Sequence, residues 1–157
     1  MNVIDVLTFG QRDVERLLAR FRPNDWEVVA LGTWTAKDLV GHLGAFEARF
    51  ADVLATFAGE PVATDLMRTD PATFNDDQAA IRKDWPREAI LSELRDAFER
   101  GITLARQLPP ETWTRVGSIP WYGPGYALDD LAVYSMYGHK REHAPQLEAV
   151  LERPGRD

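Results

Sequence analysis

Apolar side chains recur at helical spacing in four long stretches of the sequence. The stretches cover residues 3–21, 39–57, 86–108 and about 128–151. Within each of them an apolar residue returns every three or four positions, which places the apolar residues on one face of an α-helix. No stretch shows the strict alternation of apolar and polar residues that a half-buried strand produces. The pattern therefore predicts four amphipathic helices and an all-α fold.

Local residue types mark where several of these helices begin and end. Thr35 and Asp38 have the spacing of a capping box at the start of the second helix. Gly59 and Pro61 mark its end, since glycine favours the left-handed position after a helix and proline cannot continue one. Pro86 suits the first turn of the third helix, where no hydrogen bond from its nitrogen is needed.

The connection between the second and third helices is much longer than a turn. Residues 61–75 carry prolines and polar residues without periodicity, and residues 74–85 allow only a short helix. A connection of this length lets the third helix depart from a simple up-and-down order. We find no internal repeat or domain linker. The expected fold is thus a four-helix bundle with a long crossover between helices 2 and 3, in which residues 1–157 form a single domain.

Composition and charge limit the partners of this protein. The chain has 157 residues and a net charge of −7, so the phosphate backbone of a nucleic acid is not an expected partner. It contains no cysteine, which excludes disulfides, cysteine-containing zinc sites and cysteine nucleophiles. No apolar run approaches the ~18–20 residues of a membrane span, and the N-terminus lacks the pattern of a secretory signal. We therefore expect a cytoplasmic protein that does not bind membranes.

Histidine is rare in the sequence, and its distribution suggests a metal site. Of the three histidines, His139 and His143 lie four residues apart inside the apolar stripe of the fourth helix. Residues at i and i+4 share one helix face, so both imidazoles can bind a single ion at about 2.0–2.1 Å. His42 lies at the edge of the apolar face of the second helix. We expect the fold to bring His42 to the pair and form a three-histidine metal site.

Other interpretations of these histidines stay open on the sequence alone. A single histidine near an apolar face, such as His42, is more often a hydrogen-bonded core residue. The spacing of His139 and His143 also arises by chance on helix surfaces. Two imidazoles buried side by side are nevertheless unfavourable unless their nitrogens have partners, and a shared cation provides one. Histidine ligands alone suit zinc, nickel, iron or copper, and three ligands leave a position open for water or a thiolate.

Residues around the histidines have two interpretations each. Trp121, Tyr122 and Tyr126 precede the fourth helix, where they either wall a substrate pocket or plug the end of the bundle. We take these three aromatic residues as candidate substrate-binding residues. Asp38 lies one turn before His42 and can orient its imidazole, although capping of the helix is the more common role for such a residue.

Four short motifs follow one another in order along the chain. They are Trp-Thr at 34–35, Asp-Leu-Val-Gly-His-Leu at 38–43, Pro-Trp at 120–121 and His-x-x-x-His at 139–143. Together they resemble the DinB/YfiT-like superfamily of metal-binding four-helix bundles. The resemblance implies a bundle with a long crossover, commonly a homodimer, in which the three histidines hold a divalent metal such as zinc, nickel or iron.

The same resemblance implies particular activities. Members of the superfamily include transferases that use low-molecular-weight thiols, such as bacillithiol or mycothiol, and related isomerases. The Trp-Tyr-Gly-Pro-Gly-Tyr run at 121–126 is closer to the ClbS/DfsB-like branch, which includes a hydrolase that protects against a genotoxin.

The leading hypothesis is a metal-dependent enzyme, either a thiol S-transferase or a hydrolase, that acts on a small electrophilic substrate. A metal held by His42, His139 and His143 would activate the nucleophile at an open coordination position. No general base is evident, because Glu142 is expected to point away from the histidine pair into solvent. One alternative is a non-catalytic bundle that binds a small molecule or serves detoxification, with structural or vestigial histidines. Another is a metal-independent hydrolase that uses a carboxylate in the pocket.

Overall fold

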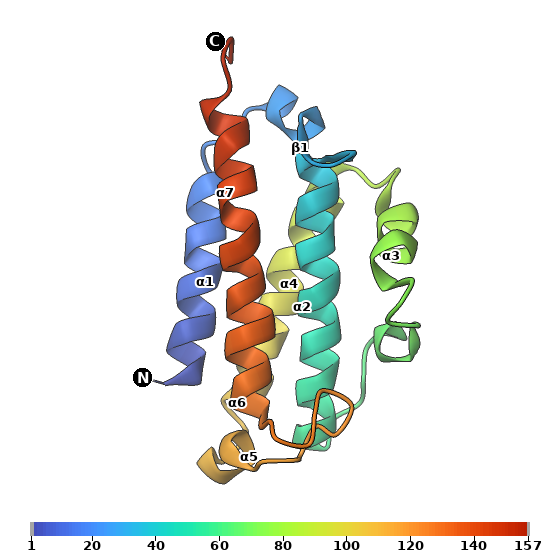
Figure 1. Cartoon of the computed structure of the whole chain (residues 1–157), viewed down its shortest axis with the longest axis vertical. Helices are drawn as coiled ribbons and strands as arrows, with labels where there is room; N and C mark the ends of the chain where they lie inside the picture. The colour runs from blue at the N-terminus through green and yellow to red at the C-terminus, as the bar shows by residue number, and fades with distance from the viewer. Residues whose placement is uncertain (1, 157) are drawn as a thin grey trace.

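The computed structural model, which describes residues 2–156, is a bundle of long helices (Figure 1). The bundle consists of α1 (Val3–Leu18), α2 (Ala36–Ala58), α4 (Arg87–Ala105) and a C-terminal helix in which α6 (Leu128–Asp130), the π-helical η3 (Leu131–Tyr137) and α7 (Gly138–Glu152) follow one another without a break. The all-α fold class predicted from the apolar spacing is confirmed. None of the helices within the described residues is long and apolar enough to cross a membrane.

The crossover between α2 and α4 sets the order of the helices. It carries η2 (Leu66–Arg68) and α3 (Phe74–Arg82) back along the outside of α2, so α4 starts at the same end of the bundle as α2 (Figure 1). As a result α2 and α4 run parallel and pack along each other. The helices α1 and α7 also run parallel to each other and pack together, in the direction opposite to α2 and α4. The long crossover expected between the second and third long helices is therefore present.

Four short elements, two helical and two extended, were not visible in the apolar pattern. The connection from α1 to α2 contains η1 (Pro23–Glu27) and an antiparallel pair of strands, β1 (Val29–Leu31) and β2 (Trp34–Thr35). A further helix, α5 (Pro110–Thr114), follows α4. Strands of three and two residues are too short to display an alternating pattern, which explains why no strand was expected.

The start of α2 is fixed by the capping box that the sequence predicted. Thr35 Oγ1 accepts a hydrogen bond from the Asp38 backbone N–H at 3.2 Å, and Asp38 Oδ2 accepts one from the Thr35 N–H at 2.9 Å. At the other end Gly59 has φ +72°, the left-handed conformation that glycine adopts without a Cβ clash. These two ends define the length and the rotation of the helix that carries His42.

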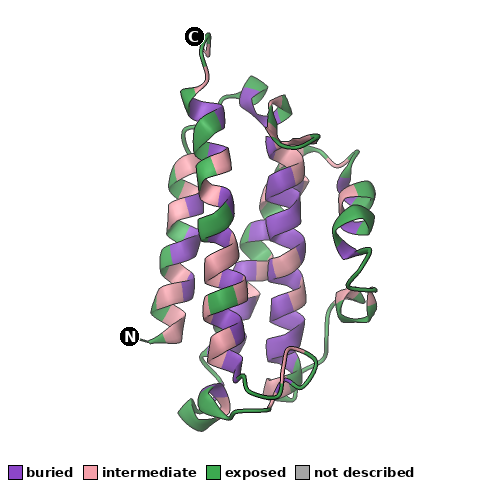
Figure 2. Ribbon diagram, in the orientation of Figure 1, coloured by how far each residue is buried: buried purple, intermediate pink, exposed green. Residues whose placement is uncertain are grey.

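The interior of the bundle is apolar towards both ends and polar between them. The buried faces of the helices turn towards one another (Figure 2). One apolar cluster contains Leu39 and Leu147, and a second contains Leu54. Between the clusters, Glu47 of α2 forms an ion pair with Lys140 of α7, and the two residues are only 3% and 2% exposed. A buried charge pair therefore joins the two helices that carry the histidines.

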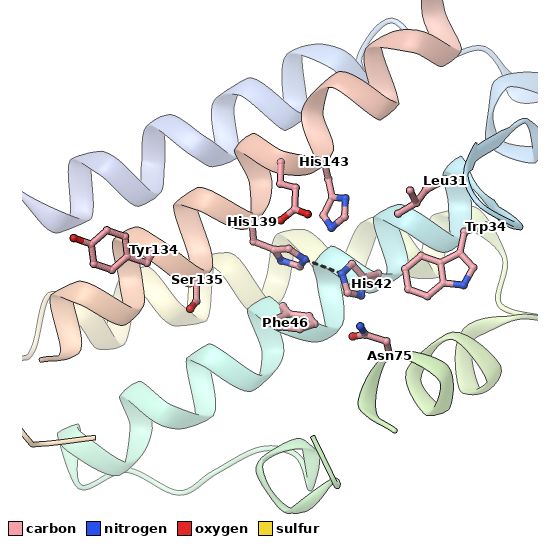
Figure 3. A pocket seen from close by; sticks show the side chains of 10 residues that line it. Leu31, Trp34, His42, Phe46, Asn75, Tyr134, Ser135, His139 and His143 are labelled. Carbon is pink, nitrogen blue, oxygen red and sulfur yellow. Dashed lines mark hydrogen bonds between the residues drawn. The ribbon is translucent and has the colours of Figure 1, made fainter. Parts of the chain in front are cut away.

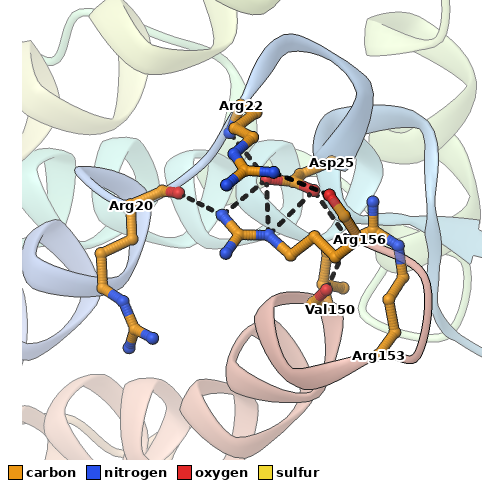
Figure 4. A network of polar contacts seen from close by, with 6 residues as sticks. All are labelled: Arg20, Arg22, Asp25, Val150, Arg153 and Arg156. Carbon is orange, nitrogen blue, oxygen red and sulfur yellow. Dashed lines mark hydrogen bonds and ion pairs between the residues drawn. The ribbon is translucent and has the colours of Figure 1, made fainter.

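The end of the chain is fastened to η1 by a second buried carboxylate (Figure 4). Asp25 Oδ1 accepts from Arg153 Nη1 at 2.7 Å, and Asp25 Oδ2 accepts from Arg156 Nη2 at 3.1 Å and from the Arg22 backbone N–H at 2.6 Å. Burial alone would raise the pKa of Asp25. The hydrogen bonds from Arg156, Arg22 and Arg153 outweigh burial and hold the pKa of this carboxyl well below its usual range.

Asp25→Asn should lower the free energy of unfolding by about 1–3 kcal/mol at pH 7, because Arg153 and Arg156 lose a charged acceptor. A carboxyl group with a lowered folded-state pKa stabilises the fold above its unfolded pKa of about 3.9, and this contribution is lost as the pH falls below that value. The difference between wild type and variant should therefore shrink below pH 4. Urea unfolding at several pH values measures it, with the exposed Asp96→Asn as control. A difference that stays constant down to pH 3 would contradict this assignment.

Candidate metal centre

The three histidines of the chain lie together between α2 and α7 (Figure 3). One ring nitrogen from each of His42, His139 and His143 lies within 4.8 Å of those of the others. The Nε2 atoms of His42 and His139 are 2.7 Å apart, and the rings of His139 and His143 are 4.6 Å apart between centroids. The fold thus brings to one point two residues of α7 and one residue that lies almost a hundred positions earlier.

Aromatic side chains hold two of the imidazoles in place. The Trp34 ring lies 5.0 Å from the His42 ring between centroids, on the side of the β1–β2 hairpin. The Phe46 ring, one turn after His42 on α2, lies 4.9 Å from His42 and 4.5 Å from His139. These contacts restrict the rotation of both rings and exclude water from one side of the cluster.

A side-chain amide orients the third imidazole. Gln146 Oε1 accepts a hydrogen bond from His143 Nδ1 at 2.7 Å. Because an amide oxygen can only accept, the proton of the neutral ring lies on Nδ1 and the lone pair lies on Nε2. Asp38, which the sequence offered as a partner for His42, instead uses its carboxylate for the Thr35 cap. The structure therefore provides an orienting partner for His143, which is Gln146, and Asp38 does not serve this role for His42.

The environment keeps two of the histidines uncharged at neutral pH. Burial, helped by the neighbouring His143, lowers the pKa of His42 to about 4. Burial lowers the pKa of His139 to about 3, with added repulsion from His42, His143 and Lys140. A histidine binds a metal through a lone pair that protonation would occupy. Both rings are therefore in the form that metal binding requires.

The histidines face an open cavity of about 440 Å³. Its lining consists of Leu31, Trp34, His42, Phe46, Asn75, Tyr134, Ser135, His139, Glu142 and His143 (Figure 3). Tyr134 is 64% exposed and Leu31 is 37% exposed, so a small molecule can reach the cavity from solvent. Glu142 is exposed, as expected from the helical spacing, yet it lines this cavity and does not lie apart from it.

These features fit a bound divalent cation. His42 Nδ1 is buried and has no hydrogen-bond partner among residues 2–156, and the Nε2 atoms of His42 and His139 face each other. Two lone pairs that point at one place repel each other unless a proton or a cation lies between them. Neutral imidazoles are suitable ligands for zinc, nickel, iron or copper. The three histidine nitrogens and the open cavity beside them therefore fit a metal ion held by this donor set.

The aromatic residues predicted to bind substrate lie beside this cavity. Trp121 and Tyr122 line a second, smaller cavity. Tyr126 lines neither cavity and makes an edge-to-face contact with Tyr122, with ring centroids 5.1 Å apart. Ser135 Oγ donates a hydrogen bond to the Tyr122 hydroxyl at 2.9 Å, and Ser135 lines both cavities. Ser135 therefore links the two groups, because it lines the histidine cavity and also forms a hydrogen bond with Tyr122.

One comparison with known proteins gives a match. A family described as the mycothiol maleylpyruvate isomerase N-terminal domain matches residues 9–133, which include His42 and end before His139. The matched family belongs to the DinB/YfiT-like superfamily that the four motifs resemble. No curated protein and no solved structure gives a significant match.

Proposed function

Because the chain belongs to the mycothiol maleylpyruvate isomerase N-terminal domain family, a DinB/YfiT-like family, we propose that it is a metal-dependent enzyme acting on small electrophiles. His42, His139 and His143 hold one divalent cation in this proposal. The observation that carries it is the convergence of three imidazoles on one point of a solvent-accessible cavity. Bound there, the cation supplies Lewis acidity that lowers the pKa of a coordinated thiol or water towards neutrality.

A thiol is the nucleophile that we favour. The matched family is named for a mycothiol-dependent isomerase, and the chain itself has no cysteine to supply the sulfur. The thiol must therefore come from a low-molecular-weight cofactor such as mycothiol. In a transfer reaction, the sulfur forms a bond to an electrophilic carbon of the substrate while the bond from that carbon to its leaving group breaks. The leaving group departs with the electron pair, as chloride does from chlorodinitrobenzene, and the thiol proton passes to a base. Water in place of the thiol would make the same site a hydrolase.

Glu142 is the group that we propose as the base. It is the acidic residue among those that line the histidine cavity, and it adjoins His143 on α7. A carboxylate within reach of the nucleophile can accept its proton, which contributes typically about 10²–10⁴-fold to a rate. Asn75, Tyr134 and Ser135 add neutral hydrogen-bonding groups to the same walls, which can orient a polar substrate.

Removal of the metal should abolish turnover, and its return should restore turnover. The protein would be loaded with zinc, nickel or iron in turn and assayed with mycothiol and chlorodinitrobenzene, and without thiol on nitrophenyl esters. Glu142→Gln should keep its metal but lose about 100-fold in rate, because proton transfer and metal binding depend on different residues. Metal content by mass spectrometry and rates by absorbance are measured on the same samples.

The outcomes separate the proposal from its rivals. Turnover that survives a chelator would overturn the metal-dependent mechanism and favour a hydrolase that uses a pocket carboxylate alone. A fully loaded protein without turnover on either set of substrates, but with reversible binding of the thiol, would favour a non-catalytic binding bundle. Equal rates for wild type and Glu142→Gln would remove Glu142 from the mechanism and leave the metal site in place.

A further inference from the structure

A second cavity adjoins the histidine cavity, and we call it the aromatic chamber. It has a volume of about 150 Å³ and is lined by Phe46, Arg49, Phe50, Val53, Trp121, Tyr122, Leu131, Ser135 and Met136. Phe46 and Ser135 also line the histidine cavity, so the two spaces share a wall. Apart from Arg49, Ser135 and the Tyr122 hydroxyl, the side chains of the lining are hydrocarbon, aromatic or thioether groups.

Arg49 places a positive charge in this apolar setting without a countercharge. Its guanidinium carbon lies 5.1 Å from the centroid of the Phe74 ring and 6.0 Å from that of the Trp121 ring. None of the ion pairs found within residues 2–156 includes Arg49. The residue is half-buried, and burial lowers its pKa. Other buried or half-buried arginines of the fold, such as Arg82 and Arg100, each pair with a carboxylate.

The size of the chamber limits what it can hold. An apolar protein cavity of about 150 Å³ accommodates one benzene ring. Phe46, Trp121 and Tyr122 contribute aromatic rings to the lining, and an aromatic ligand prefers stacked or edge-to-face contacts with such rings. A planar guanidinium at the wall matches the geometry of a carboxylate, to which it can donate two parallel hydrogen bonds.

We propose that the aromatic chamber binds a monocyclic aromatic carboxylate, with its ring among Phe46, Trp121 and Tyr122 and its carboxylate on Arg49. This inference rests on the proposed function in one respect, because it takes the bound acid to be the substrate. The reactive group of that acid would lie on the side of Phe46 and Ser135, which also line the histidine cavity. Binding of the acid to the chamber itself does not require the metal. Arg49 is a binding residue in this assignment and takes no part in bond formation.

The test compares benzoate with neutral benzamide, which has nearly the same shape and lacks the charge. Isothermal titration calorimetry on the metal-free protein should show benzoate binding more tightly, by about 10- to 100-fold, because a charge-assisted hydrogen bond is lost in benzamide. Arg49→Gln should remove this preference while leaving benzamide binding unchanged. Arg49→Lys should keep part of it, since lysine retains the charge but not the paired donors. Arg95→Gln, which breaks an exposed pair with Glu15 on another face, is the matched control.

Two results would overturn the inference. Equal affinity of Arg49→Gln and wild type for benzoate, in variants with unchanged circular dichroism, would show that Arg49 does not bind the carboxylate. Benzoate binding that is seen only in the metal-loaded protein, and is lost in His139→Ala, would place the carboxylate at the histidines instead. Failure of the proposed function leaves a different signature, because a protein that binds no metal can still distinguish benzoate from benzamide.

Discussion

Lys140→Met should lower the free energy of unfolding by about 3–5 kcal/mol, because it leaves the carboxylate of Glu47 buried and unpaired. Lys140 occupies the centre of the bundle and reaches every long helix. Its ammonium group pairs with Glu47 of α2 and lies 4.8 Å from the ring centroid of Phe98 on α4. Its Cδ lies 3.5 Å from the position that a Cβ on Gly10 of α1 would occupy. The substitution therefore changes contacts between α7 and each of the other three long helices.

The double variant Lys140→Met with Glu47→Leu should regain most of this loss. A buried ion pair that is replaced by apolar groups of similar volume is often neutral for stability, whereas half of a pair is strongly destabilising. Urea unfolding of the metal-free proteins measures both variants and excludes any contribution from metal binding. Arg95→Met is the matched control, since its pair with Glu15 is half exposed and should be worth less than about 1 kcal/mol. A single variant as stable as this control would show that Glu47 can reach water.

The spacing of apolar residues was sufficient to predict the long helices and their crossover. Each of them is amphipathic over four turns or more, so the helical period repeats often enough to be recognised. Thr35 and Gly59 fixed the ends of α2 because caps act locally and need no tertiary information. The β1–β2 hairpin and α5 escaped this approach, because elements of two to five residues carry no measurable period.

The buried charges could have been found in the sequence, but they were not. Lys140 lies four positions after Met136 and seven before Leu147, which places it inside the apolar stripe of the last helix. Glu47 has the same relation to Leu43 and Leu54 in the second helix. Opposite charges on the inward faces of two helices indicate a buried pair only if the fold places them at the same height along the bundle axis. The relative height of two helices depends on tertiary packing and cannot be read from the periodicity of either helix.

The histidines illustrate the same division between local and tertiary information. The shared face of His139 and His143 follows from their spacing, and the inward direction of His42 follows from the stripe of its helix. Their convergence depends on the relative level of α2 and α7 in the bundle, and Figure 3 shows the result. The π-helical turns of η3 lie directly before this pair, and such irregular segments recur at functional sites. Nothing in the residue types of η3 predicted them.

The residues that surround the histidines were harder to predict. Asn75 comes from the crossover and Leu31 from the hairpin, which are segments without a usable pattern. Arg49 lies on α2, whose apolar face was recognised, but a polar residue at its edge has no assigned direction in a helical projection. Only the packing of α3 and of the loop before α6 shows that Arg49 meets Phe74 and Trp121 and has no acidic partner among the described residues.

The double variant His139→Ala with His143→Ala should lose its metal. Loss of an outer hydrogen-bond partner of a ligand already costs about 10- to 100-fold in affinity, so loss of two direct ligands must cost considerably more. Mass spectrometry on untagged protein should find about one ion per chain in the wild type and almost none in the variant. His42→Ala should give the same result from a different helix, which tests whether the convergence of α2 and α7 matters as well as the spacing within α7.

Two comparisons make this experiment decisive. Glu142→Gln changes a residue of the same cavity that is not one of the three converging histidines, so it should retain the full metal content. Urea unfolding without metal should show all histidine variants folded, because the ion pair of Glu47 and Lys140 remains intact in them. Wild-type protein that binds no zinc, nickel or iron at micromolar concentrations would contradict the metal site. The histidines would then be core residues whose facing nitrogens share a proton, and the bundle would be a binding protein built around the aromatic chamber.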